Sequence, residues 1–288
     1  MYYILYSILY LFSLLPLRLI YVVSDFFYVL VYYLIGYRKK VVMQNLLIAF
    51  PEKTQKERTR IAKDFYHRFI DSMLETVKLL SAPDRFFEKR FTGNWELLDS
   101  FYNSGKAVQL HLGHTFNWEW GNIQLQKKIR YQVLGVYMPI SNPAFDRLFQ
   151  KLRRRSGTKL LSAHNMAKDF LPYRGTRYCL ALIADQSPAR MNNARWHNFF
   201  NRKTAFTTGP AKNAVKNDTI VIFAAINRPR RGYYQVTFSV AETRAAVASE
   251  QELTEKFVRY LEDVIRSNPP MWLWSHRRWK HEWKEGED

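Results

Sequence analysis

The amino terminus constrains this 288-residue chain more than any other segment does. Residues 1–17 carry no charge, and a second apolar stretch continues to Gly36 with only Arg18 and Asp25 interrupting it. The basic first region and the small-residue cleavage site of a secretory signal peptide are not seen here. The first stretch is slightly shorter than the about 20 helical residues that cross a bilayer. Residues 1–36 are therefore expected to anchor the chain, either across a membrane or within its surface; a buried helix of a soluble core is the alternative.

The charge of the chain points to an anionic partner. Lys and Arg number 44 against 25 Asp and Glu, which gives a net charge of +19. Such an excess attracts nucleic acid, acidic phospholipid or an acidic protein, and charge alone does not separate the three. Arg38, Lys39 and Lys40 directly follow the second apolar stretch, so the positive-inside rule places the remaining chain on the cytoplasmic side. The sole cysteine, Cys179, leaves no possibility of a disulfide or a cysteine metal cluster within one chain.

Hydrophobic periodicity divides the rest of the chain. Residues 42–81 have apolar side chains at helical spacing, interrupted by Pro51. After residue 105, short apolar runs alternate with amphipathic segments, which predicts an α/β fold with a central mixed sheet flanked by helices. The expected partition is an anchoring segment at 1–36 and a cytoplasmic domain at 37–288, mostly helical over 37–104 and α/β over 105–288. Strands are expected at 107–112, 132–138, 178–184, 219–226 and 233–240, and helices at 143–155, 204–215 and 250–266.

One stretch combines a strand end with two titratable side chains. Residues 109–119 read Gln-Leu-His-Leu-Gly-His-Thr-Phe-Asn-Trp-Glu. An apolar strand ends at Leu112, Gly113 permits a turn, and His114 follows it. If a helix begins near Asn117, Glu119 lies in its first turn and can reach back to the imidazole. A neutral imidazole can remove the proton of an attacking hydroxyl, and a carboxylate on its other nitrogen fixes the tautomer. We therefore expect His114 and Glu119 to be a catalytic pair, with His111 as the alternative base.

The same stretch resembles a known motif. His114-Thr-Phe-Asn-Trp-Glu119 is similar to the His-x4-Asp/Glu motif of glycerolipid acyltransferases, and its Asn-Trp-Glu resembles the bacterial lipid A late acyltransferases. Further segments match that family in order along the chain. They are Asn45-Leu46 with Phe50-Pro51, Ala184-Asp-Gln186, Phe199-Phe-Asn-Arg-Lys-Thr-Ala-Phe206 with Gly209, and Trp272-Leu-Trp-Ser-His-Arg-Arg-Trp-Lys280.

This resemblance implies an acyl donor on acyl carrier protein and an acceptor hydroxyl on a lipid A precursor. It also implies a catalytic domain on the cytoplasmic face of the bacterial inner membrane, in contact with anionic lipid. The residues expected to bind substrate are Asn117, Arg153, Arg154, Asp185 and Gln186. The segment after Gln186 reads Ser-Pro-Ala-Arg-Met, which differs from the Asp-Gln-Asp form of proteobacterial members and leaves the identity of the acceptor open.

Several other side chains of the sequence have both a functional and a structural interpretation. Arg153 to Arg155 end an expected helix, where they are either a clamp for a phosphate or a solvated face. His276 and the tryptophans around it are expected at the lipid interface. No nucleotide-binding loop or metal-ligand spacing is found, so no cofactor and no metal are expected. The alternatives are the same transfer to another amino- or glycolipid, a hydrolase with the same dyad, and a basic nucleic-acid-binding protein, which does not explain the uncharged amino terminus.

Overall fold

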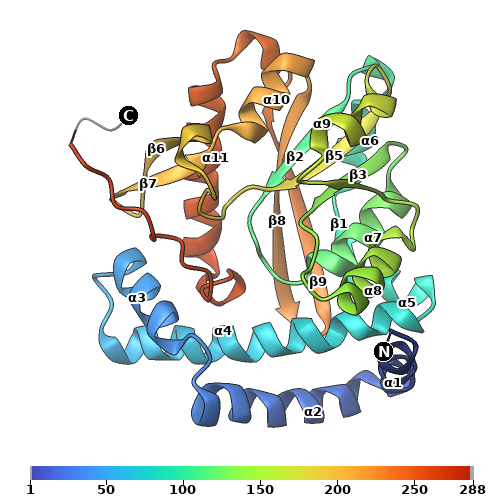
Figure 1. Ribbon diagram of the computed structural model, residues 1–288, viewed down its shortest axis with the longest axis vertical. Coiled ribbons are helices and arrows are strands. Elements are labelled where there is room, and N and C mark those ends of the chain that lie inside the picture. Colours follow the sequence, from blue (N-terminus) through green and yellow to red (C-terminus); the bar gives the residue numbers. More distant parts are fainter. Residues whose placement is uncertain (1, 286–288) are drawn as a thin grey trace.

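The computed structural model describes residues 2–285 and has a seven-stranded sheet covered by helices (Figure 1). Its strand order is β1-β9-β8-β2-β5-β3-β4, and all neighbouring strands are parallel except β8 and β9. The predicted mixed α/β sheet is confirmed. The strands are β1 (Phe91–Gly93), β2 (Val108–Leu112), β3 (Gln132–Tyr137), β4 (Lys159–Ser162), β5 (Tyr178–Ile183), β8 (Ile220–Arg230) and β9 (Tyr233–Glu242).

The centre of the sheet brings together two strand ends that carry polar residues. β2 is parallel to both β5 and β8, with Leu112 opposite Ile183 and Ala224. The backbone N–H of Ala184 donates to the carbonyl oxygen of Leu112 at 3.0 Å, which continues the pairing past the end of β5. Because the carboxyl ends of parallel strands lie at one edge of a sheet, the residues after Leu112 and after Ala184 emerge side by side.

Helices cover both faces of the sheet. α7 (Trp118–Lys128) lies over the face that carries Leu110, Leu112 and Ile226, and α11 (Glu250–Ser267) lies over the face that carries His111 and Phe223. α11 buries Leu253, Phe257, Leu261 and Ile265 against that face. The other helices of this part are α8 (Pro143–Arg154), α9 (Met166–Phe170) and α10 (Gly209–Asn217).

A layer of helices built from the first hundred residues lies beneath the sheet (Figure 1). Its longest member, α4, crosses the lower edge of the view, and α2 runs alongside it on the outside. A capping box between Thr54 and Glu57 begins α4 directly after the break at Pro51. The members are α1 (Tyr2–Leu14), α2 (Leu17–Val29), the π-helical turn η1 (Leu30–Ile35), α3 (Lys39–Ala49), α4 (Gln55–Thr76), the 3₁₀ turn η2 (Val77–Leu80) and α5 (Asp84–Glu88). The short helix α6 (Glu96–Ser100) lies apart from this layer, at the upper right of the view.

The expected helix at 204–215 is wrong in its first half. Arg202–Thr207 is strand β7, which pairs antiparallel with β6 (Ala194–Phe199) in a separate hairpin. The helix starts only at Gly209, where Pro210 in the first turn favours helix initiation. In β7 three successive residues, Thr204 to Phe206, are buried, so the strand lacks the alternating pattern that would distinguish it from the helix that follows.

Candidate active site

Asp185 binds the imidazole of His114. Oδ1 of Asp185 lies 2.5 Å from Nδ1 of His114, and Oδ2 accepts a hydrogen bond of 2.8 Å from the backbone N–H of His114. The indole N–H of Trp272 donates to the same Oδ2 at 2.6 Å. The carboxylate is thus buried with three donors around it, which fixes both its orientation and that of the ring.

The electrostatics of this contact set the tautomer of His114. Burial alone raises the pKa of Asp185, but the charge and the two hydrogen bonds of His114, together with Trp272, lower it to about 2. An ionised Asp185 requires a proton on Nδ1 and leaves Nε2 of the neutral ring with a free lone pair. The side-chain amide of Gln186 lies 3.3 Å from that Nε2, and the ring of Trp118 stands edge-on to the imidazole with centroids 5.4 Å apart.

Gly113 makes room for the two strand ends to meet. A Cβ atom at this position would lie 2.6 Å from a methyl carbon of Leu261 and 3.3 Å from Oδ2 of Asp185. Either contact is closer than real Cβ atoms comfortably approach, so a side chain here would push Asp185 and α11 away. The glycine before His114 therefore serves close packing.

Glu119 does not bind the imidazole, which corrects the expected contact. Its carboxylate is held by Arg153 through Nη2 at 2.7 Å and Nε at 3.1 and 3.2 Å, and it accepts a 3.2 Å bond from the indole of Trp118. Glu119 does lie in the first turn of α7, as expected. However, Asp185 occupies Nδ1 of the ring, and the side chain of Glu119 extends to α8 instead.

The remaining predicted site residues lie in three different places. Gln186 and Arg153 line the same cavity as His114 and Glu119. Arg154 is exposed. Asn117 is 1% exposed: its side-chain oxygen caps α7 by accepting from Trp120 N–H at 3.3 Å, and its amide donates to Glu75 at 2.9 Å. The structure therefore places Asn117 in the framework behind the site, away from the cavity where substrate was expected.

His111, the alternative base, faces the other side of the sheet. It is 2% exposed, lies 2.5 Å from the amide of Gln109, and packs edge-on against Phe257 of α11. Burial lowers the pKa of its imidazole to about 4. Successive residues of a strand alternate between faces, and this alternation separates His111 from the cavity at His114.

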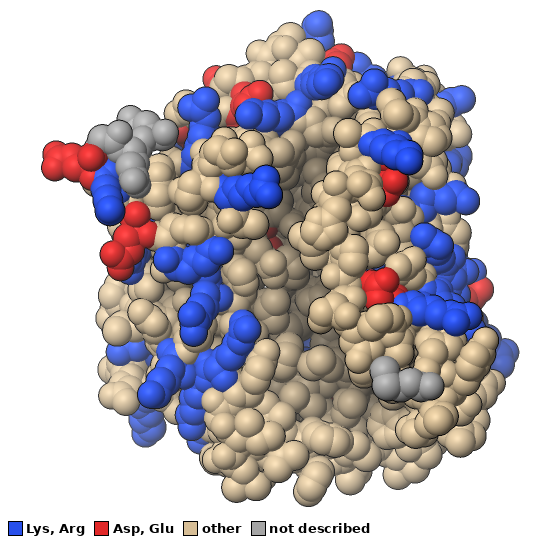
Figure 2. Space-filling model, in the orientation of Figure 1, with Lys and Arg blue, Asp and Glu red and all other residues tan. Residues whose placement is uncertain are grey.

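The cavity beside His114 is large and mostly apolar. Its volume is about 830 Å³, and Figure 2 shows this face of the molecule hollowed by a groove with Lys and Arg side chains along its walls. Its polar lining includes His114, Glu119, Arg153 and Gln186. Among the apolar lining residues are Phe91, Trp95, Leu110, Leu112, Leu125, Ala224, Ile226, Val236 and Phe238.

Comparison with known proteins identifies the family. The sequence model of the bacterial lipid A biosynthesis acyltransferase family matches residues 1–281 of this chain. The chain belongs to this family. It is also similar to "Lipid A biosynthesis acyltransferase 2" of Shigella flexneri, with 19% identity over 233 residues, which cover 80% of this chain and 74% of that protein. The family makes the chain an acyltransferase, as the motif predicts.

The carboxyl-terminal segment of this acyltransferase supports the site from behind. Trp272 and Trp274 are 2% and 0% exposed, which contradicts their expected place at a lipid interface. His276 accepts a 3.0 Å hydrogen bond from the backbone N–H of Ser187, directly after Gln186. Burial is the main cause that lowers the pKa of His276 to about 4. The tryptophan-rich block is the sequence signal for this role. The indole N–H groups of Trp272 and Trp274 donate hydrogen bonds in the core and do not face lipid.

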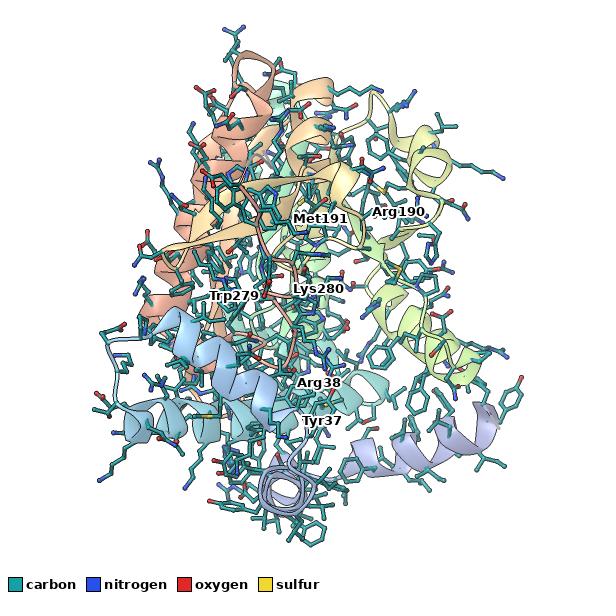
Figure 3. All side chains as sticks on the ribbon, turned by 60° about the vertical axis from the view of Figure 1, so that its left-hand side comes forward. Tyr37, Arg38, Arg190, Met191, Trp279 and Lys280 are labelled. Atoms are coloured by element: carbon teal, nitrogen blue, oxygen red, sulfur yellow. The ribbon has the colours of Figure 1, made fainter. Side chains whose placement is uncertain are left out.

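The same segment runs along one wall of the acyltransferase. Figure 3 shows Trp279 and Lys280 between the loop of Arg190 and Met191 and the turn of Tyr37 and Arg38. The guanidinium of Arg38 donates to the carbonyl oxygen of Ser275 at 3.1 Å, so the turn before α3 is tied to this segment. The amino-terminal and carboxyl-terminal segments that resemble the family are thus in contact in the fold.

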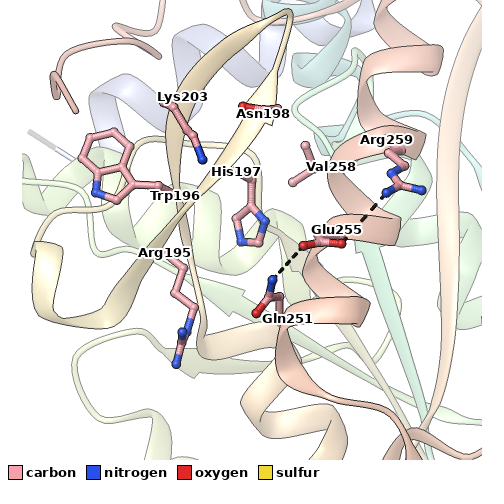
Figure 4. Close-up of a pocket in the computed structure, with 9 residues that line it drawn as sticks. All are labelled: Arg195, Trp196, His197, Asn198, Lys203, Gln251, Glu255, Val258 and Arg259. Atoms are coloured by element: carbon pink, nitrogen blue, oxygen red, sulfur yellow. Dashed lines mark hydrogen bonds and ion pairs between the residues drawn. The ribbon is translucent and has the colours of Figure 1, made fainter. Parts of the chain in front are cut away.

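A second cavity of about 490 Å³ lies between the β6–β7 hairpin and α11 (Figure 4). Arg195, Lys203 and Arg259 line it, and Glu255 supplies a carboxylate that bonds Gln251 at 3.0 Å and lies 4.0 Å from Arg259. Arg195 and Lys203 form no salt bridge with any residue of the range 2–285. The cavity is therefore net positive and is open to solvent beside the hairpin.

One acidic group has the spacing of a metal site. Ligand atoms of Asp25, His67 and Asp71 lie within 4.8 Å of one another. Arg231 forms ion pairs of 2.6 Å with both carboxylates, and Arg228 forms one of 2.7 Å with Asp71. Two guanidinium groups already balance the two carboxylates, so the group is an ion-pair network between α2, α4 and the β8–β9 turn rather than a cation site.

Proposed function

We propose that this acyltransferase moves a fatty acyl chain from an acyl carrier protein thioester to a hydroxyl of a lipid A precursor. The observation that supports the proposal most strongly is the ionised, buried Asp185 on Nδ1 of His114. It leaves Nε2 as a base on the wall of a large, mostly apolar cavity. A fatty acyl thioester and a hydroxyl acceptor are the reactants that such a base and such a cavity suit.

The reaction needs no nucleophile from the protein. The acceptor oxygen attacks the thioester carbonyl carbon as its proton moves to Nε2 of His114, and Asp185 stabilises the imidazolium that forms. The tetrahedral intermediate then collapses, the carbon–sulfur bond breaks, and the imidazolium returns its proton to the leaving sulfur. An ester and a free carrier thiol result. His114 is unchanged at the end of the cycle.

The apolar depth of the cavity suits the acyl chain. Gly121 lies on the α7 side, where an added Cβ would meet the ring of Phe91 at 3.1 Å and Ile226 at 3.6 Å. Burial of each methylene in such a site contributes about 0.8 kcal/mol. The walls at Gly121, Phe91 and Phe238 are therefore expected to set the length of chain that the enzyme accepts.

Arg153 is the residue of the basic cluster that suits an anionic group of the acceptor. Its Nε and Nη2 are bound to Glu119, which holds the guanidinium at the cavity wall. Glu119 thereby acts as a positioning residue for Arg153 and Trp118. Arg155 is directed elsewhere, because it donates to the backbone oxygens of Leu79 and Ala82.

The second cavity is suited to the acidic carrier protein. Thr207 lines the cavity of His114, and Lys203 lies four residues away on the same strand, about 13 Å at the rise of a β-strand. A carrier bound at Arg195, Lys203 and Arg259 would hold its long thioester arm within reach of the site. Replacing Arg195 and Lys203 by Glu should raise the KM for the carrier-borne donor and leave transfer from a free acyl-pantetheine thioester unchanged. The matched control replaces Lys212 and Lys216 of α10, both exposed, by Glu. An unchanged carrier KM in the first variant would contradict this assignment.

The experiment that tests the function uses purified enzyme, acyl carrier thioester and a set of lipid acceptors, with the products identified by mass spectrometry. A new ester on the lipid A precursor supports the proposal. An ester formed only on another amino- or glycolipid would retain the chemistry and replace the acceptor. Free fatty acid at the same rate with or without any lipid would indicate a hydrolase and contradict the proposal.

A further inference from the structure

The outer face of the first helices is apolar and exposed. α1, α2 and η1 form a continuous segment at the base of the molecule (Figure 1). The helix Leu17–Ile35 has 19 residues and is apolar enough to cross a membrane, yet only 17% of its most apolar stretch is buried. Side chains more than half exposed are Tyr3, Ile4, Ile8, Leu11, Leu14, Leu19, Val22, Phe26, Tyr33, Leu34 and Ile35.

The inner face of α2 is bound to α4 by polar contacts, two of which reach the buried carboxylates of Asp71 and Glu75. The hydroxyl of Tyr21 donates to Glu75 at 2.7 Å, that of Ser24 donates to Asp71 at 2.6 Å, and Asp25 lies 2.8 Å from Nε2 of His67. Glu75 and Asp71 are both 0% exposed. Glu75 also accepts from Tyr234 and from Asn117, so α2 is part of the network that supports the catalytic turn.

This attachment continues to the end of the helix. Tyr28 packs edge-on against His67 with ring centroids 5.2 Å apart, and Tyr32 packs against Tyr66 at 5.3 Å. The hydroxyl of Tyr66 donates to the carbonyl oxygen of Tyr37. The contacts run antiparallel along α4, from Glu75 beside Tyr21 to Tyr66 beside Tyr32 and Tyr37. α2 is therefore parallel to the surface of the domain over its whole length.

α1 is attached to other parts of the catalytic domain. The ammonium of Lys78 donates to the carbonyl oxygens of Ser13 and Leu15 at 2.5 and 3.0 Å, at the carboxyl end of the helix. On α8, Arg147 lies 4.3 Å from the ring centre of Tyr2, and Lys151 lies 4.2 Å from that of Tyr6. Both ends of α1 thus contact the domain that carries His114.

From these contacts we infer that the amino-terminal helices lie flat in one leaflet of an anionic membrane and do not cross it. A crossing helix would separate Tyr21, Ser24 and Asp25 from α4, leaving Asp71 and Glu75 buried with fewer partners. It would also carry Asp25 into hydrocarbon. Lying flat keeps every contact and submerges only the apolar face, while the exposed Arg18 and Lys40 are available to lipid phosphates. The inference rests on the proposed function, in which the acceptor is a lipid.

The topology of the amino terminus tests this inference without any measurement of activity. A cysteine in a short tag before residue 1 is compared with Lys216→Cys on α10, which marks the side of the catalytic domain. The native Cys179 is 0% exposed and will not react in the folded protein. In sealed vesicles with the cytoplasmic face outward, a membrane-impermeant maleimide should label both cysteines, and in vesicles of the opposite orientation it should label neither. A tag labelled only in the opposite orientation would show a crossing helix and overturn the inference.

Binding to vesicles tests the apolar face itself. Phe26→Glu and Leu34→Glu each place a charge on the exposed face without opening a cavity, so both variants should fold. Vesicle binding of purified protein should fall at least 10-fold in each variant. The matched control is Leu171→Glu, an exposed leucine at 53% on the far side of the domain near α9, and it should bind as wild type does. Equal binding by Phe26→Glu, Leu34→Glu and the control would overturn the inference, even if acyl transfer in detergent were fully active.

Discussion

Asp185 Oδ1 and His114 Nδ1 are 2.5 Å apart although 71 residues separate the two in the chain. The contact depends on the parallel pairing of β2 with β5, which brings the two strand ends to the same edge of the sheet. It also depends on Gly113, whose missing side chain leaves room for the carboxylate. The dyad is therefore a product of sheet topology, and the carboxylate nearest in sequence, Glu119, has another partner.

Substitution of the two carboxylates should separate their roles. Asp185→Asn removes the charge that holds Nδ1–H and stabilises the imidazolium, so kcat should fall about 10²- to 10⁴-fold. Glu119→Gln should affect KM for the acceptor more than kcat, because Glu119 positions Arg153. Steady-state kinetics of both variants, with circular dichroism as a folding control, will measure these changes in kcat and KM. A larger loss of kcat in Glu119→Gln than in Asp185→Asn would reverse the assignment.

The basic cluster at the end of α8 offers a matched pair. Arg153→Ala should raise KM for the acceptor about 10-fold or more, since a hydrogen bond to a charged group contributes about 1.5–3 kcal/mol. Arg154→Ala removes an exposed guanidinium of the same type one position away and should leave the kinetics unchanged. Equal KM values in the two variants would contradict substrate binding by Arg153 and would indicate that the whole cluster is a solvated helix end.

The length of the accepted acyl chain should respond to the cavity wall at Gly121. Gly121→Leu places a side chain beside Phe91 and Ile226, where even a Cβ is in close contact. The variant should prefer donors several carbons shorter than wild type, with little loss on the shortest ones. Competition between donors of different lengths, followed by mass spectrometry of the product, measures this preference. An unchanged preference would place the acyl chain outside this cavity.

The stability of the protein at acid pH should depend on the hydrogen bond between His276 and Ser187. The pKa of His276 is lowered to about 4 in the folded protein, below the value of about 6.5 in an unfolded chain. The unfolded state therefore binds this proton first as pH falls, so the stabilisation is complete above pH 6.5 and is lost between pH 6.5 and 4. His276→Gln keeps an acceptor for the Ser187 N–H without titrating. Between pH 6.5 and 4 the thermal unfolding midpoint of this variant should thus fall less than that of wild type. The same change of midpoint with pH in both proteins would contradict this role of His276.

Most of the fold follows from local sequence patterns, and the limits of that reasoning are physical. The five expected strands and the helices at 143–155 and 250–266 have apolar runs of clear period, and the structure contains all of them. β1 and β4 have three and four residues, too few to show a period. β7 has no alternating pattern of its own, so its last residues are indistinguishable in sequence from the start of the helix that follows Gly209.

Part of the site was predictable from local sequence patterns. His114 lies at a strand end next to a turn, a position readable from the chain. The partners of His114 depend on which strands are neighbours, and strand order is a long-range property that periodicity does not contain. The sequence indicates Asp185 as a site residue but does not show that it binds His114. The place of Trp272 does not follow from its residue type, because an indole suits a lipid boundary and a buried hydrogen bond equally well.

The most direct test of the account is the turnover of purified His114→Ala with acyl carrier thioester and lipid acceptor. His111→Asn, which alters the histidine on the opposite face of β2, serves as the matched control. We predict no ester product above the uncatalysed background for His114→Ala, at a folded fraction equal to that of wild type. His111→Asn should be less stable yet retain turnover per folded molecule. Wild-type turnover in His114→Ala would contradict the central claim that this imidazole deprotonates the acceptor.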